Sequence, residues 1–471
     1  IVRSQQMLGK NAFYVPGWDC HGLPIEWKIE EKYRSKGKNK DDVSTNELRA
    51  ECRKFAKEWI GIQRDEFKRL GVLGNWDDPY LTMDYSAEAV IAEEFMKFLM
   101  NGSLYQGSKP VMWSPVEKTA LAEAEIEYHE HESPTIWVKF QVKKGIHRGS
   151  FVVIWTTTPW TIPSNKAVAY SKVISYGIYR VEKTEEECWS SEGDVLFLAD
   201  NLAIDCMEKA RVTKFRRLDT LRLSDLEEMI LSHPFNDIPG SRGFWNYEVP
   251  MIDAEHVTEE TGTGFVHTAP SHGAEDFEAF VARGWARKLT HNIAEDSSFK
   301  ADIPFFSGLE VFDRKGKEGK ANKAIILKLI ESGNLLARGR LKHSYPHSWR
   351  SKAPVIFRNT PQWFVDIDKK LVDGLDKYGK SIRERALKSI DKLVKWTPAS
   401  GRNRLHSMIE SRPDWVLSRQ RAWGVPLSCF IKKGRQSSDE DFLLKDHRVN
   451  KRICEIFRKE GSDSWFMPNA K

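Results

Sequence analysis

The sequence has few of the features that mark membrane proteins or disulfide-stabilised domains. Its 471 residues include no apolar run of about eighteen residues, the length that spans a bilayer, and the mean hydropathy is −0.52. The six cysteines are scattered and form no Cys-x-x-Cys pair. The first absence excludes a membrane-spanning helix, and the scattered cysteines fit reduced thiols in a reducing compartment better than a disulfide framework.

Acidic residues are clearly outnumbered by basic residues in only one part of the chain. The formal net charge is +6, but residues 366–435 contain 17 Lys and Arg against 8 Asp and Glu. A basic surface there would suit a phosphate backbone, although a solvated charged face explains the composition equally well. The chain also begins at Ile1 without Met or a signal segment, so we expect a fragment of a longer protein.

Length and a hydrophobic content of 40% are enough for two or three domains with real cores. Residues 1–135 alternate short apolar runs with helical periodicity, which is typical of an α/β nucleotide-binding fold. From residue 136 alternating strands replace helices, and residues 341–471 return to the first pattern. The sequence therefore predicts an α/β fold in 1–135 and 341–471, interrupted by a β-rich domain at 136–340.

Several elements are predicted individually. The capping box at Ser44–Glu47 opens a long amphipathic helix that ends near Gly71. A second helix runs from about Ser86 to the cap at Asn101-Gly102, and a third covers Val449–Lys459. Asn11–Val15 has the composition of a strand.

Two polar segments of the β-rich region are candidates for a site. Ile154–Asn165 follows the apolar strand Phe151–Ile154 and places three successive hydroxyls, those of Thr156, Thr157 and Thr158, at a strand end. Gly262–Phe277 is a short strand, a Gly/Pro turn and an acidic helix start. Strand propensity alone would explain the threonines, and the helix dipole alone would favour a carboxylate at Asp276.

The α/β regions contain polar and tryptophan-rich loops of their own. Pro16–Glu26 reads Pro-Gly-Trp-Asp-Cys-His-Gly-Leu-Pro-Ile-Glu after the strand-like run, where ligands of α/β sheets bind. Two later segments, Pro361–Phe364 and Asp414–Pro426, are similarly rich in polar residues and tryptophan. Taken one at a time, their tryptophans are equally well explained as core residues.

Together these segments resemble the isoleucyl-tRNA synthetases, which are class I aminoacyl-tRNA synthetases. WTTTPWTIPSN and GTGxVHTAPxHGxxDF resemble the paired signature of their editing domain, and PGWDCHGLPIE resembles the segment that lines their aminoacyl-adenylate pocket. TPQWF and DWxxSRQRxWGVP resemble segments of the isoleucine pocket. Valyl and leucyl relatives place an arginine after the threonines, whereas Pro159 stands here. The resemblance implies a Rossmann-like class I fold interrupted by an inserted β-rich editing domain.

The implied activity is ATP-dependent attachment of isoleucine to tRNA(Ile), with hydrolytic editing of mischarged Val-tRNA(Ile). Editing is needed because one methylene is worth only about 1–3 kcal/mol in a pocket, a limit for which this family is the standard example. The resemblance assigns the editing chemistry to Thr156, Thr157, Thr158, Asn165, His267 and Asp276. It assigns contacts with isoleucine and its adenylate to Pro16, Gly17, Asp19, His21, Trp363, Gln420 and Trp423.

Elementary chemistry suggests roles for the editing residues. The threonine hydroxyls can donate to the ester carbonyl or the ribose, and Asp276 can anchor the free ammonium of the amino acid. Asn165 completes the polar wall. His267 can orient water or the terminal ribose, and with a pKa near neutrality it would be able to act as a base.

The resemblance also sets expectations for cofactors. The parent enzyme would use ATP with Mg²⁺, but the HxGH and KMSKS motifs that bind the phosphates do not occur in this sequence. We therefore expect this chain to retain the editing activity and the contacts with the amino acid, but not the full ability to form the adenylate. Many relatives bind zinc through cysteines at four positions, and the residues at those positions here are poor zinc ligands. We therefore expect no zinc, and we expect the two segments that carry these positions to pack together. Those positions are Ser114, Glu117, Ser348 and Ser351.

Three alternatives stay open at this point. His267 and His272 together suggest a metallohydrolase, but no third ligand has a useful spacing. A non-catalytic tRNA-binding module would account for the basic stretch, and a valyl-tRNA synthetase relative would share much of the pattern. Our preferred hypothesis is a monomeric, cytoplasmic, bacterial-type ligase that binds tRNA(Ile) and no membrane.

Overall fold

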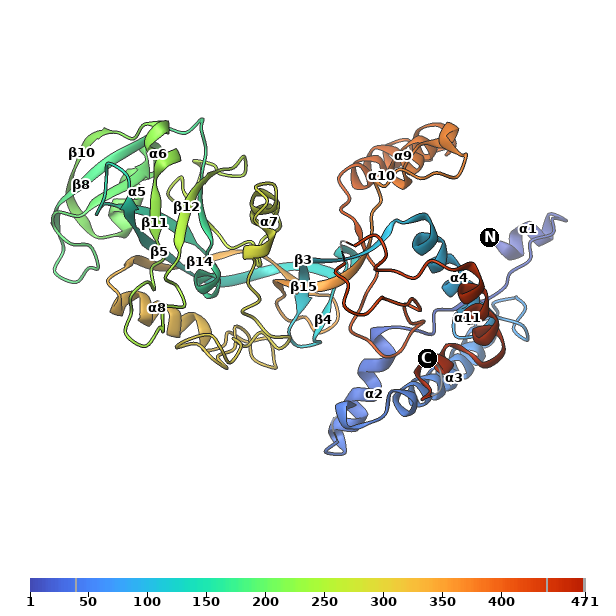
Figure 1. The fold of residues 1–471 in the computed structure, drawn as a ribbon. Helices are drawn as coiled ribbons and strands as arrows, with labels where there is room; N and C mark the ends of the chain where they lie inside the picture. Colours follow the sequence, from blue (N-terminus) through green and yellow to red (C-terminus); the bar gives the residue numbers. More distant parts are fainter. Residues whose placement is uncertain (39, 438, 469–471) are drawn as a thin grey trace. The chain divides into compact units, whose positions relative to one another are not determined.

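The computed structural model describes residues 1–38, 40–437 and 439–468, and its chain divides into two compact units (Figure 1). The split unit comprises Ile1–Gly107 and Gln362–Lys471, and the inserted unit comprises Ser108–Pro361. The β-rich region predicted at 136–340 lies wholly within the inserted unit. Within the described ranges, no helix is both long and apolar enough to cross a membrane.

In the described part of the inserted unit, ten strands form one mixed sheet, so the chain has the predicted mixed α/β class. The strand order is β10-β8-β9-β6-β5-β11-β12-β7-β13, and β14 pairs with β5. The strands are β5 (Ile126–Lys144), β6 (Phe151–Thr156), β7 (Ala167–Tyr170), β8 (Tyr176–Thr184), β9 (Val195–Ala199), β10 (Val212–Thr220), β11 (Ile230–Ser232), β12 (Glu248–Asp253), β13 (Val266–Thr268) and β14 (Leu335–Ser348). The pairs β6/β9 and β12/β7 are parallel.

Short helices pack beside this sheet. They are η2 (Glu123–Glu125), η3 (Pro159–Ser164), η4 (Asp200–Leu202), α5 (Ala203–Lys209), α6 (Leu223–Glu228), α7 (Ala274–Val281), η5 (Ala286–Lys288) and α8 (Ala321–Glu331). Cys206 and Met207 of α5 share an apolar cluster with Val153 of β6 and Leu198 of β9. Because β6 is buried on both faces, its run of β-branched residues is continuous rather than alternating, as predicted.

Two connections converge at the end of β6. Pro159 is the first residue of η3, so the threonine segment leaves the strand in a tight turn. β13 pairs antiparallel with β7, which follows η3, and His267 lies opposite Val168. After β13 the chain turns at Gly273 into α7, whose first turn carries Asp276. The predicted strand, turn and acidic helix start are therefore confirmed.

The split unit is mostly helical. Its helices are α1 (Val2–Met7), α2 (Leu23–Ser35), η1 (Lys40–Asp42), α3 (Thr45–Arg69), α4 (Tyr85–Asn101), η6 (Asp376–Tyr378), α9 (Ile382–Lys392), α10 (Ser400–Glu410), α11 (His447–Glu460) and η7 (Ser462–Phe466). The predicted long helix is α3, where the Ser44 hydroxyl accepts from Glu47 N at 3.3 Å. The second predicted helix is α4, which ends at Gly102 with a φ of +81°. The third lies within α11.

The remaining strands are β1 (Gly17–Trp18), β2 (Tyr80–Leu81), β3 (Leu104–Ser114), β4 (Thr119–Ala120), β15 (Ile356–Val365) and β16 (Trp415–Val416). The strand predicted at Asn11–Val15 is wrong. That segment has only isolated main-chain partners, such as the bond from Asn75 N to Tyr14 O at 2.9 Å. Pairing begins two residues later, where β1 lies parallel to β2.

Apolar clusters hold the split unit together. Phe95 and Leu99 of α4 pack with Ile453 and Phe457 of α11, and Figure 1 shows these two helices side by side. A second cluster joins α2, α3 and the buried Trp423. Helices α9 and α10 form a hairpin in the same figure, within the basic stretch 366–435.

Candidate functional site

The threonine segment makes a hydrogen-bonded turn at the end of β6. Thr158 N donates to Thr156 Oγ1 at 3.1 Å, and the Thr156 and Thr158 hydroxyls are also 3.1 Å apart. Thr161 donates its hydroxyl proton to Thr158 O at 2.8 Å. Thr157 is half-buried and has no side-chain hydrogen bond within the described residues, so its hydroxyl is available to a ligand.

His267 lies at the centre of this site, with a partner at each ring nitrogen. Asn165 Nδ2 is 2.8 Å from His267 Nδ1 and also donates to Ala167 O at 2.8 Å. The amide nitrogen can only donate, so Nδ1 accepts and Nε2 carries the proton. That proton points to Thr161 Oγ1 at 2.8 Å. The bonds thus run in one direction, from Asn165 through His267 and Thr161 to the Thr158 carbonyl.

This arrangement changes the expected role of His267. Burial lowers the pKa of its imidazole to about 3, so the ring is neutral at physiological pH. The expectation of a pKa near neutrality is therefore wrong, because the sequence could not show that the ring is fully enclosed. With both nitrogens bonded to protein groups, His267 is a rigid support for the threonine turn rather than a base.

Asp276 has a different environment. Its Oδ2 accepts from Ala269 N at 2.8 Å, and its Oδ1 is 3.6 Å from His256 Nε2. Burial raises the pKa of the carboxyl to about 6, although the Ala269 N–H and His256 act in the opposite direction. The side chain keeps 16% of its surface exposed. A carboxylate held ready in this way is suited to a cationic group of a ligand.

Sequence reasoning missed three residues of this site. Thr161 stands in the threonine motif without a role of its own, and His256 lies outside both segments with no spacing signal. Lys166 follows Asn165, its ammonium lies 3.9 Å from the centre of the Tyr247 ring, and burial lowers its pKa to about 8. The Tyr247 hydroxyl donates to Asn165 O at 2.6 Å. Only the fold shows that Thr161 contacts His267, that His256 faces Asp276, and that Tyr247 contacts Lys166 and Asn165.

His272 does not extend the site into a metal centre. Its Nδ1 donates to Phe357 O at 2.9 Å, its Nε2 is 3.2 Å from Ser164 Oγ, and its ring lies edge-on to Trp160. Burial lowers its pKa to about 4. Across the described ranges, no group of three or more His, Cys, Asp or Glu side chains could hold a metal ion. Both histidines therefore use their nitrogens on protein partners.

A second set of predicted residues meets in the split unit. Gly17 is in β1, and Pro16 O accepts from Tyr80 N at 2.9 Å. Asp19 Oδ1 lies 3.4 Å from both Thr82 Oγ1 and His21 N. The His21 ring is edge-on to Trp423, with centroids 4.9 Å apart.

Trp423 binds this loop directly, because its indole N–H donates to Cys20 O at 2.7 Å. Gln420 Nε2 donates to Gln362 Oε1 at 3.2 Å, and Trp363 N donates to Ser418 Oγ at 2.8 Å. The Trp363 ring stacks on Phe442 and belongs to the apolar cluster of α4 and α11. The structure thus brings His21 and Trp423 together and places Trp363 in a separate cluster.

Hydrogen bonds join the two segments that carry the four positions expected not to bind zinc. Glu117 Oε1 accepts from Ser348 Oγ at 2.8 Å and from Ser351 N at 3.1 Å. Ser114 Oγ accepts from Glu117 N at 3.3 Å. Hydroxyls and one carboxylate that are engaged in this way do not fit a tetrahedral thiolate site. The predicted packing of the two segments is confirmed.

We expect Glu117→Ala to lower the free energy of unfolding by about 1–3 kcal/mol, because Ser348 and Ser351 N lose a buried acceptor. Thermal unfolding with and without EDTA checks this, and chelation should leave the midpoint of both proteins unchanged. The matched control is Glu123→Ala, which removes an exposed carboxylate nearby. A midpoint that falls with EDTA would contradict the assignment.

The whole chain matches one family of proteins. The family model described as tRNA synthetases class I (I, L, M and V) matches residues 1–471. The chain is 62% identical over 475 residues to the isoleucine–tRNA ligase of Ruegeria pomeroyi, covering 100% of this chain and 49% of that protein. It is 52% identical over 485 residues to the isoleucine–tRNA ligase of Rhodopseudomonas palustris, covering 100% and 48%. The chain thus spans about half the length of these relatives.

Two solved structures also show similarity, each at 14% sequence identity. The crystal structure of GlLeuRS-CP1 has a TM-score of 0.25 and covers 33% of this chain and 64% of that chain. A ternary complex of Agrobacterium radiobacter LeuRS with tRNA and LeuAMS has a TM-score of 0.28 and covers 92% of this chain and 43% of that chain. At these TM-scores the superpositions carry no weight for fold or function.

Proposed function

We propose, on the premise that this chain belongs to the class I tRNA synthetases (I, L, M and V), that its parent protein is an isoleucine–tRNA ligase. The ligase would join isoleucine to tRNA(Ile) at the expense of ATP, with Mg²⁺ on the phosphates. The isoleucine–tRNA ligases of R. pomeroyi and R. palustris, at 62% and 52% identity, support this choice over a valyl enzyme. The parent ligase would be a monomer in the cytoplasm.

We further propose that the inserted unit hydrolyses Val-tRNA(Ile). The observation that carries this proposal is the wall formed by Asn165, His267 and Thr161, next to the available Thr157 hydroxyl. A neutral His267 with a hydrogen bond at each ring nitrogen supports the threonine turn and holds the hydroxyls of that turn in a fixed orientation. Asp276 would bind the ammonium of the aminoacyl group, so that the ester carbonyl meets the hydroxyl of Thr157.

In the split unit, the loop of Pro16, Gly17, Asp19 and His21 would bind isoleucine and its adenylate. Its link to Trp423 supports a shared pocket, and Gln420 is proposed to border it, whereas the Trp363 ring lies in the apolar cluster of α4 and α11. The HxGH and KMSKS motifs are not in this sequence, so the ATP phosphates have no proposed ligands in this chain.

The test of this function is release of valine from preformed Val-tRNA(Ile) by the purified chain, with Ile-tRNA(Ile) as the parallel substrate. The proposal predicts fast hydrolysis of the valyl ester and little of the isoleucyl ester. A chain that binds tRNA(Ile) with salt-dependent affinity but leaves both esters intact would instead be a binding module. Its basic stretch would suit that role, although Arg383, Arg385 and Arg402 there are paired with carboxylates.

His256 should influence the pH dependence of hydrolysis. Its imidazole lowers the pKa of Asp276, so His256→Leu should raise that pKa. If only ionised Asp276 binds the ammonium, the acid-side midpoint of the rate profile should move to higher pH. The control is His129→Leu on β5, where the histidine faces Glu127 instead, at 3.2 Å. An unchanged midpoint in His256→Leu would show that the pair does not matter for hydrolysis.

A further inference from the structure

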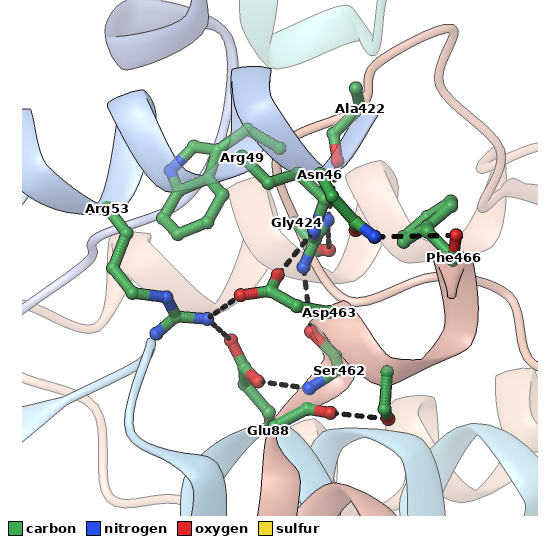
Figure 2. A network of polar contacts seen from close by, with 12 residues as sticks. Asn46, Arg49, Arg53, Glu88, Ala422, Gly424, Ser462, Asp463 and Phe466 are labelled. Atoms are coloured by element: carbon green, nitrogen blue, oxygen red, sulfur yellow. Dashed lines mark hydrogen bonds and ion pairs between the residues drawn. The ribbon is translucent and has the colours of Figure 1, made fainter. Parts of the chain in front are cut away.

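A buried cluster of charged side chains in the split unit centres on Glu88 of α4 (Figure 2). Arg53 Nη2 donates to Glu88 Oε1 at 3.0 Å and to Asp463 Oδ2 at 3.1 Å. Glu88 Oε2 accepts from Ser462 N at 2.6 Å. The Glu88 side chain is 0% exposed, so this carboxylate has no access to water. Its role needs an explanation, because burying a charge is costly even when it is paired.

The carboxylate of Glu88 stays ionised. Although burial opposes ionisation, the approach of His21 and the hydrogen bonds from Ser462 N and Arg53 lower the pKa of Glu88 to about 2. An ionised carboxylate is only an acceptor of hydrogen bonds. Every group that faces Glu88 must therefore present a proton to it.

His21 is the one of these groups that belongs to the candidate adenylate loop. Its Nε2 lies 3.4 Å from Glu88 Oε1, which is within ion-pair distance but without the geometry of a hydrogen bond, and no other acceptor among the described residues bonds to this buried nitrogen. Trp423 holds the ring from the side, at a centroid distance of 4.9 Å. With Nε2 turned toward an obligate acceptor, the favoured neutral tautomer carries its proton on Nε2.

The other ring nitrogen is then an acceptor. Within the described residues, His21 Nδ1 has no hydrogen-bond partner, and the side chain retains 13% of its surface. A lone pair on Nδ1 would accept from an N–H or O–H donor of a ligand. Isoleucyl-adenylate offers both kinds, an ammonium and ribose hydroxyls.

We propose that Glu88 is a positioning residue that fixes the tautomer of His21, so that Nδ1 accepts a hydrogen bond from the isoleucyl-adenylate. This inference rests on the proposed function of the split unit, because it names the role of one residue in that pocket. Glu88 touches no ligand itself. A purely structural role, in which Glu88 only neutralises Arg53, makes different predictions.

The experiment uses the whole chain, labelled with ¹⁵N-histidine, and two variants that each remove one carboxylate from Arg53. Glu88→Leu removes the carboxylate that faces His21, and Asp463→Leu removes the one that does not. Glu88→Gln is the conservative variant, because its amide oxygen can still accept from Nε2. The imidazole ¹⁵N shifts of His21 at pH 8 report which nitrogen carries the proton. Calorimetry with a non-hydrolysable isoleucyl-sulfamoyl-adenosine reports binding.

We expect the Nε2–H form of His21 in the wild-type chain, in Glu88→Gln and in Asp463→Leu, and a mixture of tautomers in Glu88→Leu. Binding of the adenylate analogue should weaken about tenfold in Glu88→Leu, the effect of losing about one hydrogen bond, and much less in Glu88→Gln. The inference is overturned if the tautomer of His21 is the same in Glu88→Leu as in the wild-type chain. It is also overturned if Glu88→Leu and Glu88→Gln weaken binding equally.

Failure of the proposed function would look different. A wild-type chain that does not bind the analogue at all would contradict the adenylate pocket, while the tautomer of His21 would still test whether Glu88 sets it. If Glu88→Leu does not fold, Glu88→Gln decides the matter. A glutamine variant with the Nδ1–H tautomer would overturn the inference, because its amide oxygen is expected to preserve the Nε2–H form.

Discussion

Asp276→Asn is expected to slow hydrolysis of Val-tRNA(Ile) by about a hundredfold at pH 7.5. The side chain keeps its shape and can still accept from Ala269 N, but it can no longer pair with the ammonium of the aminoacyl group. Truncating one partner of a buried charge pair costs about 2–5 kcal/mol, and a hundredfold corresponds to the low end of that range. In the unchanged chain the rate should fall below about pH 6, where Asp276 becomes protonated.

The same substitution should leave the fold intact or make it more stable. The folded pKa of Asp276 is about 6, above the ordinary value of 3.8, so the folded state favours the protonated carboxyl. Ionisation of this group therefore opposes folding as the pH rises from about 4 through 6, and the effect is complete above 6. The substituted amide carries no charge, so Asp276→Asn should gain about 1–3 kcal/mol relative to the unchanged chain above pH 6.

Two measurements check this pair of effects. Single-turnover release of valine between pH 5 and 8 gives the rates, and urea unfolding at pH 5 and 8 gives the stabilities. Glu275→Gln is the matched control, since it removes an exposed carboxylate from the same first turn of α7 and leaves the helix dipole unchanged. If Glu275→Gln lost as much activity as Asp276→Asn, the helix start rather than Asp276 would be responsible.

Arg49→Met is expected to lower the free energy of unfolding of the split unit by about 3–5 kcal/mol. The Arg49 side chain is 0% exposed and lies where α3 meets η7 and the Ala422–Gly424 loop (Figure 2). It donates to Asp463 Oδ1 at 2.5 Å, to Ser462 Oγ at 2.8 Å, and to the carbonyls of Ala422 and Gly424 at 2.5 and 2.7 Å.

Methionine fills a similar volume but donates nothing, so Ser462 Oγ and the two partly buried carbonyls lose a donor, and the Asp463 carboxylate keeps only Arg53. The expected loss is this large because several acceptors lose their donor at once, and each acceptor left unsatisfied costs about 1–3 kcal/mol. The loop that holds Trp423 should also loosen, since both carbonyls flank that residue and the Arg49 guanidinium lies 5.4 Å from its ring.

Denaturant unfolding followed by tryptophan fluorescence measures this loss. The control is Arg64→Met in the same helix, where the arginine is 40% exposed and its nearest acid, Asp65, is 3.9 Å away. That change should cost less than about 0.5 kcal/mol. A loss below about 1 kcal/mol in Arg49→Met would show that the cluster is not the anchor of these loops.

The sequence by itself determined the elements that depend on local signals. The capping box before α3, the glycine at the end of α4 and the apolar run of β6 each act through their own neighbours, so the predicted helices and strand are present. The motif residues Thr156 to Thr158, Asn165, His267 and Asp276 could be named for the same reason, because they lie in two contiguous segments. Asn11–Val15 failed because a strand also needs a partner in space.

The tertiary structure decided what these residues can do. Two segments more than a hundred residues apart meet at β7 and β13, and only there do Asn165 and Thr161 occupy both nitrogens of His267. Burial then makes His267 neutral and raises the pKa of Asp276, which no residue pattern encodes. Arg49 and Glu88 read in the sequence as ordinary charged positions of amphipathic helices. The partners of Arg49, and Ser462 beside Glu88, come from the other end of the chain, since enclosure and pairing arise only once distant segments pack together.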